Sequence, residues 1–220
     1  MTDAEPVLRV AGVRKSFSTP AGTATVLDGV DLAVDAGEIV ALGGRSGSGK
    51  TVLLTVVAGW ERPDGGTVEL VQDTGTNGAE PRWRELAVVP QSLGLLDELT
   101  VEENILLPRR LDPQRRPGDA ADDLTARLGI DHLARRFPSQ ISRGEQQRVA
   151  LARAAALAPR LLLADEPIAH QNESFAEAVL AVIADLAASG TACLLATHDD
   201  LAFRAAHRTL QLTDGHLHPR

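Results

Sequence analysis

The chain has 220 residues, of which 44% are hydrophobic and 24% are charged, and its formal net charge is −8. These are ordinary values for a globular protein that buries a full core, and the acidic balance argues against a broad nucleic-acid-binding surface. The N-terminal residues lack a basic start, and no apolar run approaches the roughly 20 residues that span a bilayer, so neither a secretory signal nor a membrane anchor is expected.

Two strands are predicted near the N-terminus. Residues 7–13 and 26–34 both alternate loosely between apolar and polar side chains, and residues 35–37 form the turn that follows. Phe17 lies between the two strands. An aromatic ring there either stacks on a planar ligand such as adenine or packs at the edge of the core, and both interpretations stay open.

The next stretch carries the clearest motif. An apolar strand is predicted at residues 38–42 and a helix at 52–58, and residues 44–51 between them fit G-x-x-x-x-G-K-[ST]. Glycines let the backbone curl so that its N–H groups surround phosphate oxygens, and the helix N-terminus adds partial positive charge. We expect Lys50 to reach the outer phosphates of a nucleotide and the Thr51 hydroxyl to bind Mg²⁺. The motif consists of Gly44, Arg45, Ser46, Gly47, Ser48, Gly49, Lys50 and Thr51.

Strand patterns resume after this helix. A turn at residues 62–66 and a strand at 67–71 are followed by a polar, glycine-rich loop at 73–81. A short apolar strand at 86–89 then brings Gln91 to its end. Because ligands bind at the carboxyl ends of parallel strands in open α/β sheets, Gln91 is a candidate site residue.

Helical patterns replace strands between about residues 92 and 157. Helices are predicted at residues 100–107, 119–128 and 143–157, and residues 112–118 form a linker between the first two.

The last of these helices opens with the sequence Ser142-Arg143-Gly144-Glu145, which is a capping box. Ser142 and Glu145 would satisfy each other's backbone N–H groups, and that structural role is sufficient by itself. A capped helix N-terminus is also a phosphate receptor. Since this one lies far from residues 44–51 in sequence, its phosphate could belong to a second copy of the chain.

Two apolar strands near the C-terminus each end at polar side chains. Residues 161–164 lead into Asp165 and Glu166, which could place Asp165 beside a Mg²⁺ held by Thr51 and Glu166 beside a water that attacks the γ-phosphate. Residues 193–196 lead to His198, which either contacts the γ-phosphate or merely ends a strand.

Helices are predicted on either side of the second of these strands, at residues 174–188 and 201–206. This alternation of strands and helices indicates a parallel sheet with crossover connections. The single cysteine, Cys193, is expected to be a reduced core residue, which suits the cytoplasm.

These residues together resemble the nucleotide-binding subunit of an ATP-binding cassette (ABC) transporter, over nearly the whole chain. Within that family, residues 46–51, 99–104 and 159–167 are similar to the lipoprotein-release, macrolide-export and cell-division ATPases. The resemblance rests on six motifs in the right order: Phe17 at the adenine-stacking position, residues 44–51, Gln91 at the glutamine loop, residues 141–148 at the family signature, Asp165-Glu166, and His198 at the switch histidine.

The resemblance implies an α/β fold of the P-loop NTPase class, with a RecA-like mixed sheet core, an N-terminal antiparallel β subdomain and a helical insertion. It implies one ABC ATPase domain, in which residues 1–91 and 158–220 form the nucleotide-binding core and residues 92–157 form the helical signature subdomain. The site residues that it implies are Lys50, Gln91, Glu166 and His198 for catalysis, Phe17, residues 44–51, Ser142 and Gly144 for ATP binding, and Thr51, Gln91 and Asp165 for Mg²⁺ binding.

The resemblance also implies partners. Two chains would form a head-to-tail homodimer, or a heterodimer with another ABC ATPase, and hold two ATP molecules between the loop of one chain and the signature helix of the other. A transmembrane permease subunit would hold the cytoplasmic chain on the inner face of the membrane, and no nucleic acid is involved. ATP binding would close the dimer and hydrolysis would reopen it, because the γ-phosphate differs between the two states.

Two departures from the family pattern lie on the face that completes the partner's site. Arg143 replaces the first glycine of the usual Leu-Ser-Gly-Gly signature, so its side chain either points away, adds a cation at the γ-phosphate, or hinders closure. The loop after Glu166 usually ends in Leu-Asp, whereas here it reads Ile-Ala-His-Gln-Asn over residues 168–172, and Asn172 removes a negative charge.

Three functions are consistent with these features. The first is an ATPase subunit that powers a membrane exporter or a lipoprotein-release-type system. The second is a regulatory ATPase that transmits a mechanical signal through a membrane partner. The third, which the two departures would suit, is a partly degenerate subunit paired with a competent ATPase. The transported or sensed molecule is not encoded here, since in this family the membrane subunit selects it.

Overall fold

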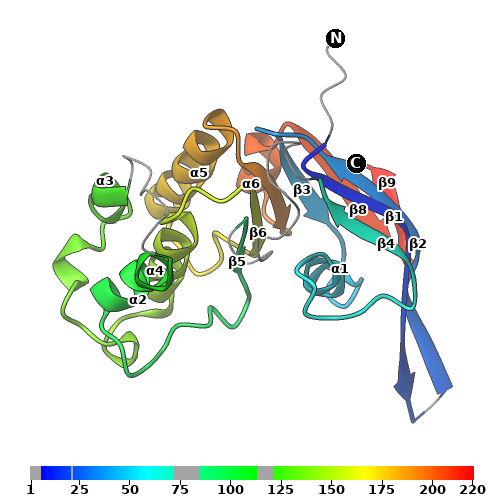
Figure 1. The fold of residues 1–220 in the computed structure, drawn as a ribbon, viewed down its shortest axis with the longest axis horizontal. Coiled ribbons are helices and arrows are strands. Elements are labelled where there is room, and N and C mark those ends of the chain that lie inside the picture. The colour runs from blue at the N-terminus through cyan, green and yellow to red at the C-terminus, as the bar shows by residue number, and fades with distance from the viewer. Residues whose placement is uncertain (1–5, 21, 72–84, 113–120) are drawn as a thin grey trace.

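The computed structural model describes residues 6–20, 22–71, 85–112 and 121–220. The predicted loop at 73–81 and all but the first residue of the predicted linker at 112–118 lie outside the described residues. Figure 1 shows strands gathered on one side of the molecule and helices on the other, with α1 (Lys50–Val57) beside the strands.

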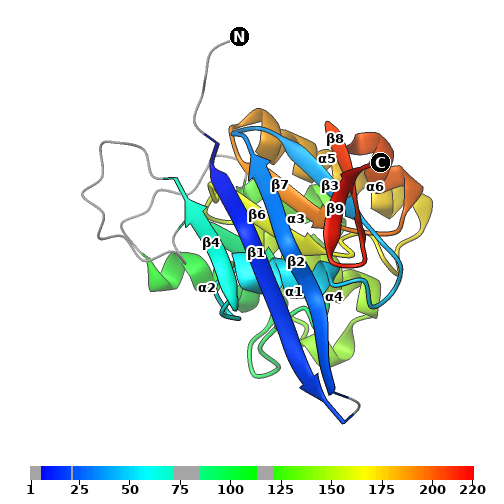
Figure 2. The ribbon, with the colours of Figure 1, turned by 90° about the vertical axis from the view of Figure 1, so that its right-hand side faces the viewer.

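The described strands form two sheets. In one, β1 pairs with β2 and β4 in antiparallel fashion, and this sheet faces the viewer in Figure 2. In the other, the order is β5-β6-β7-β3-β8-β9, and all pairs are parallel except β8 with β9. The strands are β1 (Leu8–Thr19), β2 (Gly22–Val34), β3 (Ile39–Gly43), β4 (Gly65–Leu70), β5 (Leu86–Val89), β6 (Leu161–Asp165), β7 (Ala192–Ala196), β8 (Arg208–Thr213) and β9 (His216–Pro219).

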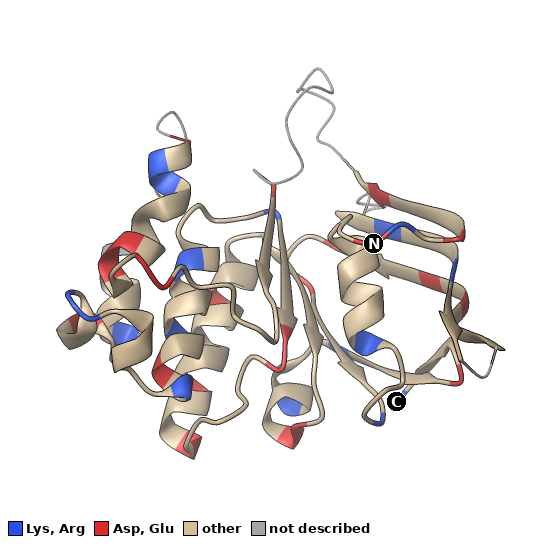
Figure 3. Ribbon diagram, turned by 90° about the horizontal axis from the view of Figure 1, so that it is seen from below, with Lys and Arg blue, Asp and Glu red and all other residues tan. Residues whose placement is uncertain are grey.

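The remaining described helices lie mainly on one side of the mixed sheet (Figure 1). Charged residues occur mostly on helices and peripheral loops, whereas the central strands are largely uncharged (Figure 3). Among the described residues, no helix combines the length and hydrophobicity needed to cross a bilayer. The helices are α2 (Val101–Leu111), α3 (Ala121–Arg127), α4 (Arg143–Ala155), α5 (Glu173–Ala188) and α6 (Asp200–Ala205), with single 3₁₀ turns at Asp131–Leu133 and Pro138–Gln140.

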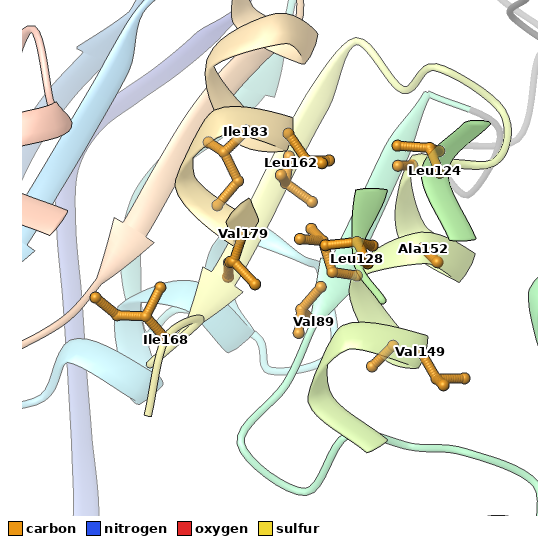
Figure 4. Packing of buried hydrophobic residues seen from close by; sticks show 14 of the residues in the cluster. Val89, Leu124, Leu128, Val149, Ala152, Leu162, Ile168, Val179 and Ile183 are labelled. Carbon is orange, nitrogen blue, oxygen red and sulfur yellow. The ribbon is translucent and has the colours of Figure 1, made fainter. Parts of the chain in front are cut away.

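The central strands β3, β6 and β7 of the mixed sheet are buried on both faces, which explains their nearly uninterrupted apolar sequences. Successive side chains of a strand point to opposite faces. In β6, Leu161 and Leu163 therefore join the cluster that contains α1 and the antiparallel sheet, whereas Leu162 and Ala164 join the cluster that contains α4 and α5. Figure 4 shows the second cluster, in which Leu162 lies near Ile183 of α5.

Cys193 follows the same alternation in β7. It is fully buried in the cluster that contains α4 and α5, and it is a free thiol. Burial raises the pKa of this thiol to about 12.

The observed elements confirm the predicted order of strands and helices, as well as the implied mixed sheet and antiparallel N-terminal sheet. The largest boundary difference is in β1, which continues to Thr19 rather than ending near residue 13. It continues because it stays paired with β2 as a long hairpin through several irregularities of register. The 3₁₀ turns in the helical region were not predicted, because such short turns carry no periodic pattern.

Asn104 holds the segment before α2 onto that helix. Its side chain is fully buried, accepts a hydrogen bond from the backbone N–H of Leu96 at 2.9 Å, and donates to the backbone oxygens of Leu96 and Leu99, each at 3.0 Å. An asparagine replaces several turn hydrogen bonds here, which is why a polar side chain is buried at this position.

Asn104→Ala should lower the free energy of unfolding by about 1–3 kcal/mol, because it removes the hydrogen bonds by which this buried side chain holds the backbone of Leu96 and Leu99. Urea unfolding followed by circular dichroism measures this change. The control is Glu102→Ala in the same helix turn, where the side chain is exposed and the cost should stay below about 1 kcal/mol. Equal stabilities of the two variants would contradict this role for Asn104.

Candidate functional site

A cavity of about 800 Å³ lies where β3, β5, β6 and β7 end. Because carboxyl ends of parallel strands share one edge of a sheet, motifs far apart in sequence meet there. Of the predicted site residues, only Ser142 and Gly144 do not line this cavity. Those that line it are Phe17, Gly44, Arg45, Ser46, Gly47, Ser48, Gly49, Lys50, Thr51, Gln91, Asp165, Glu166 and His198.

The loop between β3 and α1 adopts a backbone that requires glycine. Gly44 and Gly49 have φ angles of 152° and 104°, a region that residues with a Cβ rarely occupy. A Cβ on Gly44 would lie 2.4 Å from the Ser48 Oγ, and one on Gly49 would lie 2.7 Å from a methyl carbon of Val26. Space and backbone conformation therefore both select glycine at these positions.

Several polar groups of this loop are arranged to receive an anion. The Lys50 Nζ donates to the backbone oxygen of Gly44 at 2.7 Å, which holds the ammonium over the loop. Among the described residues, no side chain caps the start of α1, so its first N–H groups stay available to a ligand. The Ser48 Oγ is buried without a hydrogen-bond partner in the described part of the chain. A ligand with oxygen acceptors would satisfy these donors.

The first turn of α1 is tied to the end of β6. The Thr51 hydroxyl donates to Asp165 Oδ2 at 2.6 Å, which brings together two hard oxygen ligands of the kind that Mg²⁺ prefers. Among the described residues, no three His, Cys, Asp or Glu side chains gather into a metal site. Mg²⁺ usually completes its shell with phosphate oxygens and waters, so Thr51 and Asp165, with Gln91 on the same cavity, fit this ion when a nucleotide is present.

The buried position of Asp165 makes its carboxyl group costly to ionise. Only 4% of its surface is exposed, and this burial raises the pKa of the carboxyl group, with a further increase from the neighbouring Glu166. The hydrogen bond from Thr51 and the charge of Lys50 oppose the rise in pKa without cancelling it. A divalent cation beside this carboxylate would favour its ionised form.

Glu166 and His198 form a second polar pair in the cavity. Glu166 Oε1 lies 2.7 Å from His198 Nδ1, and Glu166 has a φ of 53°, which is uncommon for a residue other than glycine. Gln147 of α4 donates its side-chain N–H to the Glu166 backbone oxygen. The strand end, the helix α4 and the histidine thus fix the direction of the Glu166 carboxylate.

Phe17 is 38% exposed and lines the cavity from the β1–β2 hairpin. An aromatic ring with this much free surface on a cavity wall favours the ligand-stacking interpretation over core packing.

Ser142 begins α4 with the predicted capping box. Its Oγ accepts from the Glu145 N–H at 3.3 Å, and its own N–H donates to Glu145 Oε2 at 2.7 Å. Gly144, in the first turn of α4, is buried against the loop that follows β6. A Cβ on Gly144 would lie 2.9 Å from the backbone oxygen of His170, so this glycine permits the close approach of loop and helix.

Arg143 is exposed and lines the cavity. One guanidinium nitrogen donates to the backbone oxygen of Gln91 at 2.5 Å. In this single chain, therefore, the side chain turns toward its own glutamine loop.

The loop at residues 168–172 is also held within the chain. Gln171 accepts from Arg148 at 2.6 Å and donates to the Gly144 backbone oxygen at 2.9 Å. Asn172 is the N-cap of α5, where its side chain accepts from the Phe175 N–H at 3.0 Å. The residues that depart from the family pattern thus make contacts that stabilise their own chain.

Sequence reasoning missed Gln147 and Arg148 as supports of this site. Both are buried, and the Arg148 guanidinium lies 3.9 Å from the ring centre of Phe175. The available signal was a run of four polar residues, 145–148, that continues into the part of α4 that packs against the core, and the signature motif obscured it.

Comparison with known proteins places the chain among transporter ATPases. The sequence model of the family described as ABC transporter matches residues 27–169. The chain is 40% identical to the lipoprotein-releasing system ATP-binding protein LolD of Maricaulis maris, over 97% of this chain and 96% of that protein. It is 36% identical to an uncharacterized ABC transporter ATP-binding protein of Mycobacterium tuberculosis, over 98% of this chain and 90% of that one.

Solved structures of ABC transporter cassettes have the same fold as this chain. The dimeric structure of MJ0796, a bacterial ABC transporter cassette, matches with a TM-score of 0.84 and 27% identity, over 96% of both chains. A dimeric post-hydrolysis state of the same cassette, bound to ADP and Pi, also has a TM-score of 0.84, with coverage of 96% of this chain and 98% of that one.

Asp165→Asn should stabilise the nucleotide-free protein. A raised folded-state pKa means that ionised Asp165 disfavours folding above that pKa, and that this cost disappears as the pH falls through it. Removing an electrostatic cost of about 1 kcal/mol from the folded state would raise the melting temperature by about 2–4 °C near neutral pH. This increase in melting temperature should shrink toward about pH 4, the ordinary range of an aspartate.

Thermal unfolding across pH measures this effect, with Asp97→Asn as the control at an exposed aspartate. A variant at residue 165 that melts below the wild type at neutral pH would contradict the electrostatic cost assigned to Asp165.

Proposed function

Because this chain belongs to the ABC transporter family, as one of its ATP-hydrolysing subunits, we propose that it powers a lipoprotein-release-type membrane export system. The chain length and the identity to two LolD proteins support this assignment, since the alignments cover 97% of this chain. The ATPase chemistry rests on one observation: the phosphate loop (residues 44–51), the Thr51–Asp165 pair and the Glu166–His198 pair face a single cavity.

The proposed division of labour in this cavity follows from the geometry. Lys50 and the N–H groups at the start of α1 would hold the β- and γ-phosphates, and Thr51, Asp165 and Gln91 would hold Mg²⁺. The ion supplies positive charge that offsets the charge developing on the phosphate oxygens. Glu166 would orient the attacking water, while His198 holds the carboxylate and contacts the γ-phosphate. Phe17 would stack on the adenine.

We propose that two chains complete each site head to tail. Ser142 and Gly144 do not line their own cavity, yet Ser142 presents a hydroxyl at a helix N-terminus, a favourable place for phosphate. Such residues would serve a nucleotide held by another chain. The division into a core, residues 1–91 and 158–220, and a helical subdomain, residues 92–157, forms part of this proposal, and the grouping of α2 to α4 between β5 and β6 supports it.

A transmembrane permease is the proposed partner, and it would hold this chain against the inner face of the membrane. The names of the relatives support a membrane-linked system. The departures of Arg143 and Asn172 from the family pattern, with side chains bonded within their own chain, favour one further candidate, a partly degenerate subunit that works beside a competent ATPase. ATP turnover by the purified chain alone separates the two, since a degenerate subunit would hydrolyse ATP only with its partner.

Glu166→Gln should reduce ATP turnover at least about a hundredfold, because the amide does not draw a proton from water. ATP binding should persist, and the chain should form a stable dimer with ATP and Mg²⁺ in size-exclusion chromatography with light scattering. Lys50→Ala is the contrasting variant, since it should weaken ATP binding itself. Wild-type turnover in either variant would contradict the assigned roles.

Arg143→Gly should raise turnover by about two- to tenfold, because it removes both the bond to Gln91 and a side chain from a surface that closes on the partner's nucleotide. Arg143→Lys is the control, since it keeps the charge and much of the bulk and should resemble the wild type. A fall in turnover for Arg143→Gly would mean that the guanidinium contributes to the site. Steady-state phosphate release measures both variants.

A further inference from the structure

Lys15 is a buried cation close to the proposed adenine platform. It is 8% exposed, and its Nζ donates to Glu61 Oε1 at 2.6 Å and to the Arg62 backbone oxygen at 2.8 Å. Asp64 Oδ1 lies 3.5 Å from the same nitrogen. The Nζ also lies 5.2 Å from the ring centre of Phe17, within the range of a cation–π interaction.

The position of Lys15 on β1 is unusual. Lys15 and Phe17 are two residues apart on β1, and the 5.2 Å between the Lys15 Nζ and the Phe17 ring centre shows that their side chains meet, although the strand pairing is irregular between Lys15 and Ser16. The buried residues before them on β1, Val10 and Val13, belong to the core cluster around α1. A lysine therefore follows the buried valines of β1, and its ammonium is surrounded by two acids, a backbone oxygen and the Phe17 ring.

The contacts of Lys15 join the hairpin to the helix that carries the phosphate loop. Glu61 and Asp64 lie in the turn after α1, and the Glu61 N–H donates to the Thr55 backbone oxygen within α1. Asp64 also accepts from the Ser16 N–H at 2.7 Å. The charged cluster of Lys15, Glu61 and Asp64 thus links the strand that carries Phe17 to the helix that follows residues 44–51.

We propose that Lys15 is a positioning residue for the nucleotide base: it holds the Phe17 ring at a fixed place relative to the phosphate loop. This role rests on the proposed function, because it requires a nucleotide in the cavity that Phe17 lines. The ligand group concerned is the aromatic base of a nucleoside triphosphate, and Lys15 acts on it through Phe17 without contacting it.

Charge on Lys15 is maintained by its surroundings. The hydrogen bond to Glu61 raises the pKa of the ammonium, burial opposes this rise, and the charge of Asp64 adds to it. The cation therefore persists throughout the pH range in which the protein would bind ATP.

The test is a double-mutant cycle on ATP affinity, measured by calorimetry with Mg²⁺. Lys15→Met should weaken ATP binding by about three- to tenfold, as expected for the loss of a partly desolvated cation–π contact. In a Phe17→Ala background the same substitution should have no further effect, because residues that act through one another are not additive. Lys15→Arg should retain most of the affinity.

A second ligand separates base positioning from a general loss of structure. Inorganic tripolyphosphate has no base, so its affinity should not change in Lys15→Met, whereas Lys50→Ala should weaken both ligands. Arg14→Met is the matched control, since Arg14 is the neighbouring cation on β1 and its side chain is 66% exposed. It should leave both affinities unchanged.

Equal loss of ATP affinity with and without Phe17, or equal loss for ATP and tripolyphosphate, would overturn the role of Lys15. Should Lys15→Met fail to fold, Glu61→Ala removes the acceptor of the shortest contact of the ammonium. It should weaken the binding of ATP and not of tripolyphosphate, and no change in ATP binding would then overturn the proposal. Failure of the wild type to bind ATP would instead count against the proposed function itself.

Discussion

The hydrogen bond between Thr51 and Asp165 is the contact on which the arrangement of the cavity depends. It joins the first turn of α1 to the end of β6, across 114 positions of sequence. One face of β6 packs into the cluster that holds α1, and the other packs into the cluster that holds α4 and α5. A carboxyl group at that junction is costly to ionise. The fold accepts this cost at the point where a metal ion and phosphates would offset it.

Contacts within the chain dominate the surface that is proposed to face a partner. Arg143 binds the backbone of its own glutamine loop, Gln171 binds the backbone of Gly144, and Asn172 caps α5. The chain thus differs from the family pattern at positions where its own structure gains hydrogen bonds. In the proposed dimer, competition between these internal bonds and the contacts of the closed state would be a simple physical basis for tuning the rate of closure.

Much of this structure could be predicted from the sequence, and the exceptions have a common cause. Apolar strands ending in polar residues predicted β3, β5, β6 and β7, and the glycine-rich motif predicted the loop before α1, because these features depend on local pattern. The order of the strands in the sheet depends on tertiary packing, and the direction of the Arg143 side chain depends on its bond to the backbone oxygen of Gln91. Lys15 and Asn104 are polar residues in buried positions, where periodicity alone suggests an interruption. The roles of the predicted site residues stay predictions.

The buried thiol in β7 makes the chain convenient for chemical labelling. Cys193 is the only cysteine in the sequence, it is fully buried, and its high pKa leaves almost no thiolate to react. A maleimide or a disulfide-forming reagent would therefore find no target in the folded wild type. Cysteines introduced on the β1–β2 hairpin or beside α4 would therefore be modified while Cys193 stays unreacted. Cross-links between two such chains would report their relative orientation, and the native cysteine would not have to be removed first.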